Sequence, residues 1–522
     1  MRIGVRENRM SILDEHTSTA VALDSPDTVS ESRAAYTLHA QQLSLFGAPS
    51  LPQGESQNAF RDPAFADNKS LPVHRWVPWI AGYSAAFVDG AMATYLPKRK
   101  TACVLDPFCG VGTTLLQALW RGHTAIGFEI NPYPALAARA KLDAPTIDLD
   151  MFDATLGTLQ KLSETWKTAE PPGGITPPPL KSRLPFFSPA VEKQVLHVLH
   201  FIQTLTSPVI ADLYRTAFGA VMVSFSNYSY EPSLGSRPAA GKPLIVEADV
   251  AHVLLTKLRH MRADLVWLKE ETQGKCLGTG RVINADFFSE HGQLETGSVH
   301  LMVTSPPYMN NYHYVRNTRP QLYWLNFIAS PGEQKYLEIH NFGQYWQTVR
   351  DAGPVPLAFD YPGLAKTLEQ LRSTRIEQGA YGGPGWANYV ATYFNDCCRF
   401  MVTLKRVLAR GGVGVVVIGN SIIQGIDIRT EHLLGEIGIM QGLTLEGVYC
   451  IRDKRVGASI TQSSVRQGTR TQAVLSEFAV GFDHGAGHPL LLLYDAKISR
   501  GENVNNFNSL YYDPFIISAS LF

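Results

Sequence analysis

Short apolar runs that end at turn residues or acids recur along this chain. The clearest cover residues 102–105, 124–129, 299–303 and 413–418. Runs of this length, bounded by glycine, proline or polar residues, are typical of strands that are buried in a sheet. Apolar residues at helical spacing fill much of the sequence between them. Strands that alternate with helices predict an α/β fold with a mostly parallel sheet.

Two more apolar runs lie near the C-terminal end, at residues 445–452 and 474–482. We expect them to pair in antiparallel fashion and to close the sheet. An amphipathic pattern over residues 389–408 predicts a long helix. We expect this helix to end at Gly411 and Gly412, because glycine is the usual residue just past a helix end.

The strand over residues 299–303 leads directly into Thr304-Ser305-Pro306-Pro307-Tyr308. Two consecutive prolines fix the main chain and leave it only carbonyl acceptors. The Ser305 hydroxyl and the Pro306 carbonyl therefore form an acceptor-rich notch beside an aromatic ring. Chemistry on an exocyclic amino group needs acceptors for its N–H protons and a ring face on which the base can stack. Taken alone, the motif also fits an ordinary loop.

A glycine turn follows the strand over residues 102–105, with the sequence Asp106-Pro107-Phe108-Cys109-Gly110-Val111-Gly112-Thr113-Thr114. Glycine lets the main chain bend sharply and approach a ligand closely, and the threonines are expected to cap the helix that follows. The next strand ends at Glu129. A strand, glycine turn, helix and second strand with a terminal acid are typical of a nucleotide-type site. The third glycine of the NAD fingerprint is missing, which argues against NAD.

Together the two motifs resemble those of the amino-group DNA methyltransferases, which use S-adenosyl-L-methionine. The glycine turn is similar to the family's D-P-F-x-G-x-G-T-T motif, and Ser-Pro-Pro-Tyr is similar to its catalytic [DNS]-P-P-[YFW] motif. The resemblance implies a Rossmann-like seven-stranded sheet, mostly parallel with an antiparallel closing hairpin, plus a helical insertion. The catalytic residues that it implies are Ser305, Pro306, Pro307 and Tyr308. The cofactor-binding residues that it implies are Asp106, Phe108, Gly110, Gly112, Thr113, Thr114, Glu129 and Asp286.

Two of these implied roles have simple structural alternatives. Asp286 ends a predicted strand over residues 280–286, where the family's acid bonds the cofactor adenine, but it is also placed to cap a helix. Trp76 and Trp79 occupy the place where the family packs a segment over the methionine end of the cofactor. They fit equally well as core aromatics.

The resemblance implies methyl transfer to a flipped base, without a metal. Serine at position 305 is linked within the family to cytosine N4 more often than to adenine N6. An N6-adenine DNA methyltransferase, an RNA base methyltransferase and a non-enzymatic, cofactor-binding DNA-tethering protein are the alternatives. A C5-cytosine enzyme would need a Pro-Cys nucleophile, and the sequence has no such dipeptide. It has no nuclease motif either, so any restriction endonuclease partner should be a separate chain.

Charge and cysteine content limit the partners and the compartment. Lys and Arg number 46, as do Asp and Glu, so contacts with double-stranded DNA require local basic patches. The best patch is the loop over residues 453–472, although a solvated surface is its alternative; its candidate DNA-binding residues are Lys454, Arg455, Arg466 and Arg470. Six cysteines without C-x-x-C spacing predict a reducing cytoplasm rather than disulfides or zinc. No apolar signal region or membrane-length run is present, which predicts a cytoplasmic protein that works at the bacterial nucleoid.

Composition shifts divide the chain into seven predicted segments. They are a largely disordered arm (1–70), the cofactor half of the methyltransferase domain (71–148), a helical insertion that is the candidate target-recognition region (149–275), the catalytic half (276–330), an irregular insertion (331–385), the closing strands (386–485) and a C-terminal tail (486–522). Within the helical insertion, helices are expected over residues 189–206, 210–226 and 247–270. The polar, aromatic loop over 227–238 suits contact with bases or phosphates, or a structural lid.

A short motif in the predicted arm suggests a further partner. Gln42-Leu43-Ser44-Leu45-Phe46 resembles the pentapeptide that docks proteins onto the bacterial replication sliding clamp. In that motif the contacts come from Gln42, Leu43, Leu45 and Phe46. The alternative is an amphipathic helix over residues 34–46 that packs on the domain.

Overall fold

Residues 67–79, 82–96, 101–230, 233–454 and 475–485 are described by a computed structural model, with residues 452–454 described by their main chain alone. All of them belong to the unit Phe46–Phe522. The clamp-like pentapeptide at residues 42–46, the basic residues Arg455, Arg466 and Arg470, the Lys454 side chain and the segment 486–522 lie outside the described part. No described helix is both long enough and apolar enough to cross a membrane.

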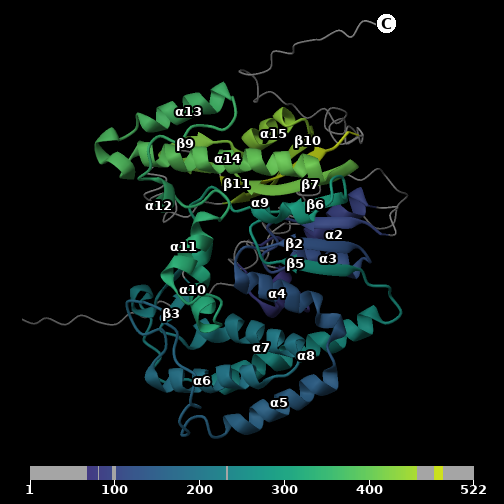
Figure 1. Cartoon of the computed structure of the whole chain (residues 1–522), viewed down its shortest axis with the longest axis vertical. Helices are drawn as coiled ribbons and strands as arrows, with labels where there is room; N and C mark the ends of the chain where they lie inside the picture. Colours follow the sequence, from purple (N-terminus) through teal and green to yellow (C-terminus); the bar gives the residue numbers. More distant parts are fainter. Residues whose placement is uncertain (1–66, 80–81, 97–100, 231–232, 455–474, 486–522) are drawn as a thin grey trace, which may run out of the picture. The chain divides into compact units, whose positions relative to one another are not determined.

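Seven strands form one sheet in the order β10-β11-β7-β6-β1-β2-β5 (Figure 1). Neighbours from β7 to β5 are parallel, whereas β11 runs antiparallel to both β7 and β10. This topology confirms the predicted Rossmann-like sheet with its closing hairpin. The strand bounds are β1 Cys103–Asp106, β2 Thr124–Phe128, β5 Thr279–Ile283, β6 Val299–Thr304, β7 Leu408–Gly419, β10 Thr444–Lys454 and β11 Leu475–Asp483.

Helices cover both faces of the sheet, which explains why its central strands are continuous apolar runs. Successive side chains of β6 point to opposite faces: Leu301 and Val303 join one apolar core, and Met302 joins the other. Helices that contribute to the first core include α2 Ala85–Tyr95, α3 Thr113–Trp120 and α4 Pro132–Leu142. Helices that contribute to the second include α9 Phe287–Glu290, α13 Pro362–Arg372, α14 Gly383–Val407 and α15 Thr430–Met440.

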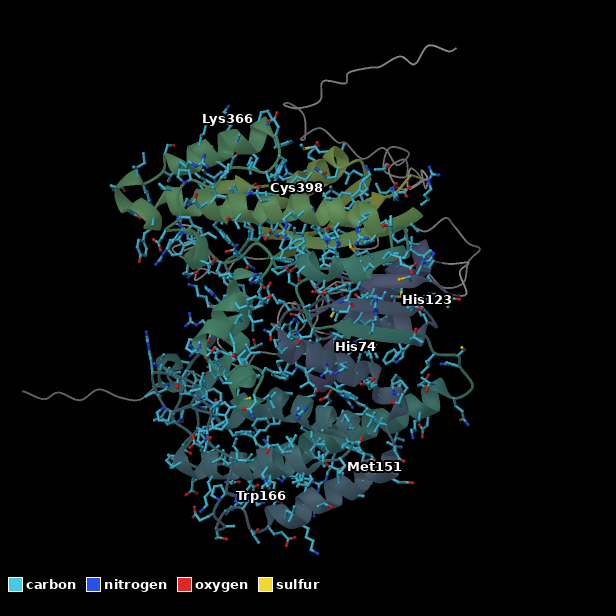
Figure 2. All side chains as sticks on the ribbon, viewed as in Figure 1. His74, His123, Met151, Trp166, Lys366 and Cys398 are labelled. Carbon is cyan, nitrogen blue, oxygen red and sulfur yellow. The ribbon has the colours of Figure 1, made fainter. Side chains whose placement is uncertain are left out.

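The segment between β2 and β5 carries four further helices, α5 Leu149–Ser163, α6 Pro189–Thr204, α7 Pro208–Val221 and α8 Val250–Thr272. The helices predicted from residues 189, 210 and 247 onward are thus present. They pack on one another and, through α7, on α4. Trp166, labelled in Figure 2, stacks on the His197 ring of α6, with the two ring centroids 5.6 Å apart. The loop predicted over residues 227–238 includes a small hairpin of β3 Tyr228–Tyr230 and β4 Leu234–Ser236.

One buried acid of this insertion fixes the segment ahead of the glycine turn. The Asp264 carboxylate on α8 accepts hydrogen bonds from the main-chain N–H of Val73 at 2.9 Å and from Trp76 Nε1 at 3.0 Å. It also pairs with Arg75. Trp76 is 1% exposed and is therefore a core residue, which was the simpler of its two interpretations.

Three sequence predictions about local structure were wrong. Residues 331–385 are not irregular: they contain α11 Pro331–Ile339, α12 Trp346–Val349 and α13. The Ser330 side chain caps α11 by accepting from the Glu333 N–H, and α13 buries Leu364, Leu368 and Leu371 at helical spacing. Proline and glycine at the helix starts and in the joining loops concealed this pattern.

The second error concerns the glycines after α14. The helix ends at Val407 and passes directly into β7, so Gly411 and Gly412 lie inside the strand. Gly411 has φ 72°, and a Cβ at position 412 would lie 2.8 Å from the Val299 carbonyl oxygen. Here β7 changes register against β6. The glycines permit this irregularity and the close approach of the main chains.

The third error concerns the threonines of the glycine turn. The N-cap of α3 is Gly112, in a left-handed conformation, and no side chain caps the helix. In addition, the predicted disordered arm ends before residue 70, because Asp67–Lys69 form a 3-10 turn in which Asn68 is fully buried. The Asn68 side chain accepts from the Ala85 N–H at 2.9 Å.

Candidate active site

The two signature loops meet at the carboxyl edge of the parallel strands. The chain builds the sheet outward from β1 to β2 and β5, and then from β6 to β7 on the other side. Ligands of open α/β sheets bind at such a switch point, outside the strand ends. A cavity that is open to solvent lies there. Its residues at the strand ends are Phe108, Gly110, Glu129, Asp286, Ser305 and Pro307.

Glu129 holds the glycine loop through its main chain. Its two carboxylate oxygens accept from the N–H of Gly110 at 3.0 Å and from the N–H of Asn131 at 2.8 Å. Burial raises the pKa of Glu129 to about 7, against the lowering effect of these two hydrogen bonds. Each carboxylate oxygen has a second lone pair, so the side chain can still accept from a ligand hydroxyl.

Gly110 brings the main chain close to an aromatic side chain. Its φ is +49°, and a Cβ at this position would lie 3.2 Å from Trp79 Nε1. Trp79 also lines the cavity. The segment ahead of the glycine turn therefore contributes one aromatic wall, and any larger residue at position 110 would press against it.

Asp106 lies behind the cavity and ties the two loops together. It is 1% exposed and accepts from the Tyr83 hydroxyl at 2.7 Å and from the Thr304 hydroxyl at 2.6 Å. The Phe108 N–H also reaches it at 3.2 Å. Burial raises the pKa of Asp106. The contacts of this carboxylate are thus to the protein itself.

Three further residues of the glycine motif, Gly112, Thr113 and Thr114, are also packed rather than exposed to the cavity. Thr114 donates to the Val303 carbonyl at 3.2 Å, Thr113 accepts from the Asn68 amide at 3.5 Å, and a Cβ at Gly112 would lie 2.9 Å from that of Ala138. Among the implied cofactor-binding residues, the structure therefore brings Phe108, Gly110, Glu129 and Asp286 to the cavity. It places Asp106, Gly112, Thr113 and Thr114 beneath it.

The Asp286 side chain both caps a helix and reaches the cavity, the two alternatives that its sequence context allowed. One carboxylate oxygen caps α9 by accepting from the Phe288 N–H at 3.1 Å. The same side chain lines the cavity. Burial raises its pKa. The helix cap and the cavity contact are thus compatible.

A tyrosine of a distant element holds the Ser-Pro-Pro-Tyr loop. Tyr393 of α14 donates to the Pro307 carbonyl at 2.9 Å. Among the described residues, no donor reaches the Pro306 carbonyl. Pro306 is buried and is not among the residues that line the cavity.

Tyr308 lies beside the cavity, whereas Ser305 and Pro307 line it. The Cδ2–Cε2 edge of the Tyr308 ring lies next to Gly419, where a Cβ would lie 3.1 Å from Cδ2. Burial raises the pKa of the Tyr308 phenol well above its usual value, and the nearby Glu477 carboxylate raises it further.

Comparison with known proteins agrees with this arrangement. No family model matches the chain. The type II methyltransferase M.AvaI of Nostoc sp. is 22% identical over 420 residues, which cover 74% of this chain and 82% of that protein. The type II methyltransferase M.BsoBI of Geobacillus stearothermophilus is 24% identical over 431 residues, which cover 76% and 83%. This chain is a homologue of the type II methyltransferases.

Two weaker matches add little. The type II methyltransferase M.MjaII of Methanocaldococcus jannaschii is 32% identical over 81 residues, 14% of this chain and 15% of that protein. Among solved structures, the rRNA methyltransferase AviRa of Streptomyces viridochromogenes aligns at 11% identity over 84% of this chain and 89% of its own, with a TM-score of 0.24. That score is too low to support any argument.

The methyltransferase site also includes residues that sequence reasoning missed. His340, Asn341 and Phe342, which follow α11, form part of the cavity wall. The centroids of the Phe342 and Phe108 rings lie 5.1 Å apart. The expectation that residues 331–385 are irregular concealed these three residues. Only the aromatic side chain of Phe342 could have indicated a role in a binding site. Tyr314, at the start of α10 Tyr314–Trp324, lines the cavity as well. No cluster of metal-ligating side chains occurs among the described residues.

Proposed function

We propose that this methyltransferase transfers a methyl group from S-adenosyl-L-methionine to the exocyclic amino group of a flipped base in double-stranded DNA. The observation that carries the proposal is a shared cavity. Glu129, Asp286 and Gly110 from the cofactor motifs line the same cavity as Ser305 and Pro307 from the catalytic motif. The homology to type II methyltransferases supports it.

The residues of the cofactor half fit S-adenosyl-L-methionine. Glu129 supplies carboxylate acceptors for ribose hydroxyls, and Asp286 supplies one for an amino group of the adenine. Phe108 and Phe342 offer apolar ring surface next to these acids. When bound, the cofactor supplies an activated methyl group.

Ser305 and Pro306 act on the target amine. The lone pair of an aromatic amine is delocalised into the ring, and acceptors placed at its protons make the nitrogen more electron-rich as it attacks. The Ser305 hydroxyl at the cavity wall and the Pro306 carbonyl are these acceptors. The Tyr308 ring would stack on the base once it has left the duplex.

Cytosine N4 is the proposed target atom. Its support is Ser305 at the first position of the motif, which in related enzymes accompanies cytosine more often than adenine. Docking onto the sliding clamp through residues 42–46, association with a separate restriction endonuclease, and base or phosphate contacts by the helical insertion stay predictions.

Mass spectrometry of nucleosides tests the proposal directly. DNA from cells that express the protein should contain N4-methylcytosine, which should be absent from cells that express Ser305→Ala. Ser298→Ala is the matched control, because Ser298 lies just before the other end of β6 and bonds only locally. N6-methyladenine in place of N4-methylcytosine would correct the target base. Unmodified DNA from cells with folded, cofactor-binding protein would refute DNA methylation.

A further inference from the structure

The segment ahead of the glycine turn forms one wall of the cavity, and side chains from distant parts of the sequence hold this segment. Trp79 lines the cavity, and its Nε1 lies next to Gly110, where a Cβ would come within 3.2 Å of it. Shortly before Trp79, His74–Trp76 form the 3-10 turn η2. The function proposed above gives no role to the residues that fix this turn.

The main chain at the start of η2 is strained. Val73, its N-cap residue, has φ 63° and ψ −46°, and a positive φ is a genuine outlier for a β-branched residue. The His74 N–H donates to the Pro72 carbonyl at 2.7 Å, which closes a γ-turn of the rare, strained type around Val73. Such a conformation costs about 1–3 kcal/mol and persists only where the surrounding structure enforces it.

The Asp264 carboxylate on α8 enforces this conformation. It is 1% exposed. Its Oδ2 accepts from the Val73 N–H at 2.9 Å and from Trp76 Nε1 at 3.0 Å. The Arg75 guanidinium donates to both of its oxygens. Hydrogen bonds to an ionised group are the stronger ones, so a buried carboxylate with three partners in four residues holds this short segment in one conformation.

The connection from η2 to the cavity is short and stiff. Only Val77 and Pro78 separate Trp76 from Trp79. Val77 is 2% exposed and extended, with φ −124° and ψ 119°, as expected before a proline. The ring of Pro78 fixes its own φ. The place where Trp76 is held therefore determines where Trp79 enters the cavity wall.

A second buried side chain joins η2 to the glycine turn. Lys141 on α4 is 1% exposed. Its Nζ donates to the His74 carbonyl at 3.2 Å and to the Val111 carbonyl at 3.0 Å. Val111 lies between the two glycines of the turn. The spacing between the glycine turn and the segment that carries Trp79 is thus fixed by a direct bridge.

We infer that Asp264 is a positioning residue for the methyl donor, because it holds the strained turn at Val73 and thereby keeps Trp79 in the cavity wall. The inference rests on the proposed function, since it takes the cavity as the site of S-adenosyl-L-methionine. It gives the helical insertion, which the sequence suggested for target recognition, a part in cofactor binding.

Calorimetry with S-adenosyl-L-methionine tests the inference in a double-mutant cycle. Asp264→Ala should raise the Kd about tenfold, because Trp79 is no longer held in place. In a Trp79→Ala background the same substitution should change the Kd less than about twofold, since the residue through which Asp264 acts is gone. Asp264→Asn keeps an oxygen that can accept from Val73 and Trp76, and it should recover most of the affinity.

Asp153→Ala is the matched control. Asp153 on α5 of the same insertion accepts from Arg262, two residues before Asp264 on α8, at 3.0 and 2.7 Å. Its side chain is 44% exposed, and its loss should leave the Kd unchanged. A wild-type Kd in Asp264→Ala, or an equal loss in both Trp79 backgrounds, would overturn the inference. A wild-type protein that does not bind S-adenosyl-L-methionine would instead refute the proposed function.

A spectroscopic measurement on the cofactor-free protein is independent of affinity. Tryptophan is replaced throughout by 5-fluorotryptophan, and the Trp79 resonance is assigned by its absence in Trp79→Phe. This resonance should shift in Asp264→Ala and stay in place in Asp153→Ala. An unchanged resonance in Asp264→Ala would show that the carboxylate does not position Trp79, and the inference would fail.

Thermal unfolding verifies that each variant is folded, and a milder substitution covers the case in which Asp264→Ala is not. Trp76→Phe keeps an apolar ring at the buried position and removes only the Nε1 donor to Asp264. It should shift the Trp79 resonance and weaken binding of S-adenosyl-L-methionine about threefold. A Trp76→Phe protein with the wild-type resonance and the wild-type Kd would also overturn the inference.

Discussion

The glycine loop and the Ser-Pro-Pro-Tyr loop lie at the same sheet edge, but they are stabilised in different ways. The Gly110 N–H is bonded by Glu129, a residue close in sequence. The Pro307 carbonyl is bonded by Tyr393 of α14, and the Tyr308 ring lies against Gly419 at the end of β7. The position of Gly110 thus depends on a contact within the β1–β2 unit, although Asp106 and Thr114 of the same motif also bond to β6. The catalytic loop takes its shape only when β7 and α14 are in place.

This difference suggests that cofactor binding and catalysis can be separated by substitution. A change in the local bonds of the glycine loop should weaken the cofactor site alone. A change in the distant bonds of the catalytic loop should slow the reaction and spare cofactor affinity. Substitution of a residue that bonds to both loops should affect both cofactor affinity and the reaction rate.

Asp106 bonds to both loops, so its substitution should have the largest effect. In Asp106→Ala the buried Thr304 hydroxyl loses its acceptor and the buried Tyr83 hydroxyl loses one of its partners, which should lower the free energy of unfolding by about 3 kcal/mol. Urea unfolding measures this loss. Asp89→Ala removes a surface ion pair with Arg121 and should cost less than about 1 kcal/mol. Equal losses in the two variants would show that Asp106 does not connect the loops.

The local loop was easier to predict from the sequence than the distant contacts. Its strand, glycines and terminal acid follow one another within a short segment, so spacing alone indicated that Gly110 and Glu129 would lie together. Tyr393 gave no such signal, because only the complete fold brings it to Pro307. No local pattern encodes a contact made across so many residues.

The error at Gly411 and Gly412 has a similar physical origin. A glycine with positive φ can end a helix or permit an irregularity in a strand. The local sequence is the same in both cases. The choice is made by β6, whose Val299 carbonyl lies against the Gly412 position, and this tertiary contact is not visible in the sequence.

The second-largest effect should be the pH dependence of stability that Glu129 causes. Its pKa rises from 4.5 to about 7 on folding, so the native state holds this proton more tightly than the unfolded chain. The stabilisation is therefore complete below about pH 4.5 and is lost as the pH rises through about 7. Compared with Glu129→Gln, wild type should lose up to roughly 3 kcal/mol of unfolding free energy over this interval. The same substitution at exposed Glu295 should leave the wild-type profile intact, and parallel profiles for wild type and Glu129→Gln would contradict the assignment.

Gly110→Ala should weaken the cofactor site with a smaller energetic cost. The left-handed conformation costs a residue with a side chain about 1–2 kcal/mol, and the new methyl group would press on Trp79. Calorimetry should show roughly tenfold weaker binding of S-adenosyl-L-methionine. Gly157→Ala in α5 is the matched control, since a Cβ there meets no atom within 4 Å. Unchanged affinity in Gly110→Ala would mean that the loop does not approach the cofactor.

Tyr393→Phe should have the smallest effect and tests the comparison most directly. The ring stays buried, and only the hydroxyl that donates to the Pro307 carbonyl is removed. A loss of about 1 kcal/mol should lower the single-turnover rate by roughly fivefold and leave cofactor affinity unchanged. Tyr336→Phe, at an exposed position of α11, should change neither value. If Tyr393→Phe weakened cofactor binding as much as it slowed the reaction, the two loops would not be held independently. The catalytic loop would then depend on the same contacts that order the glycine loop.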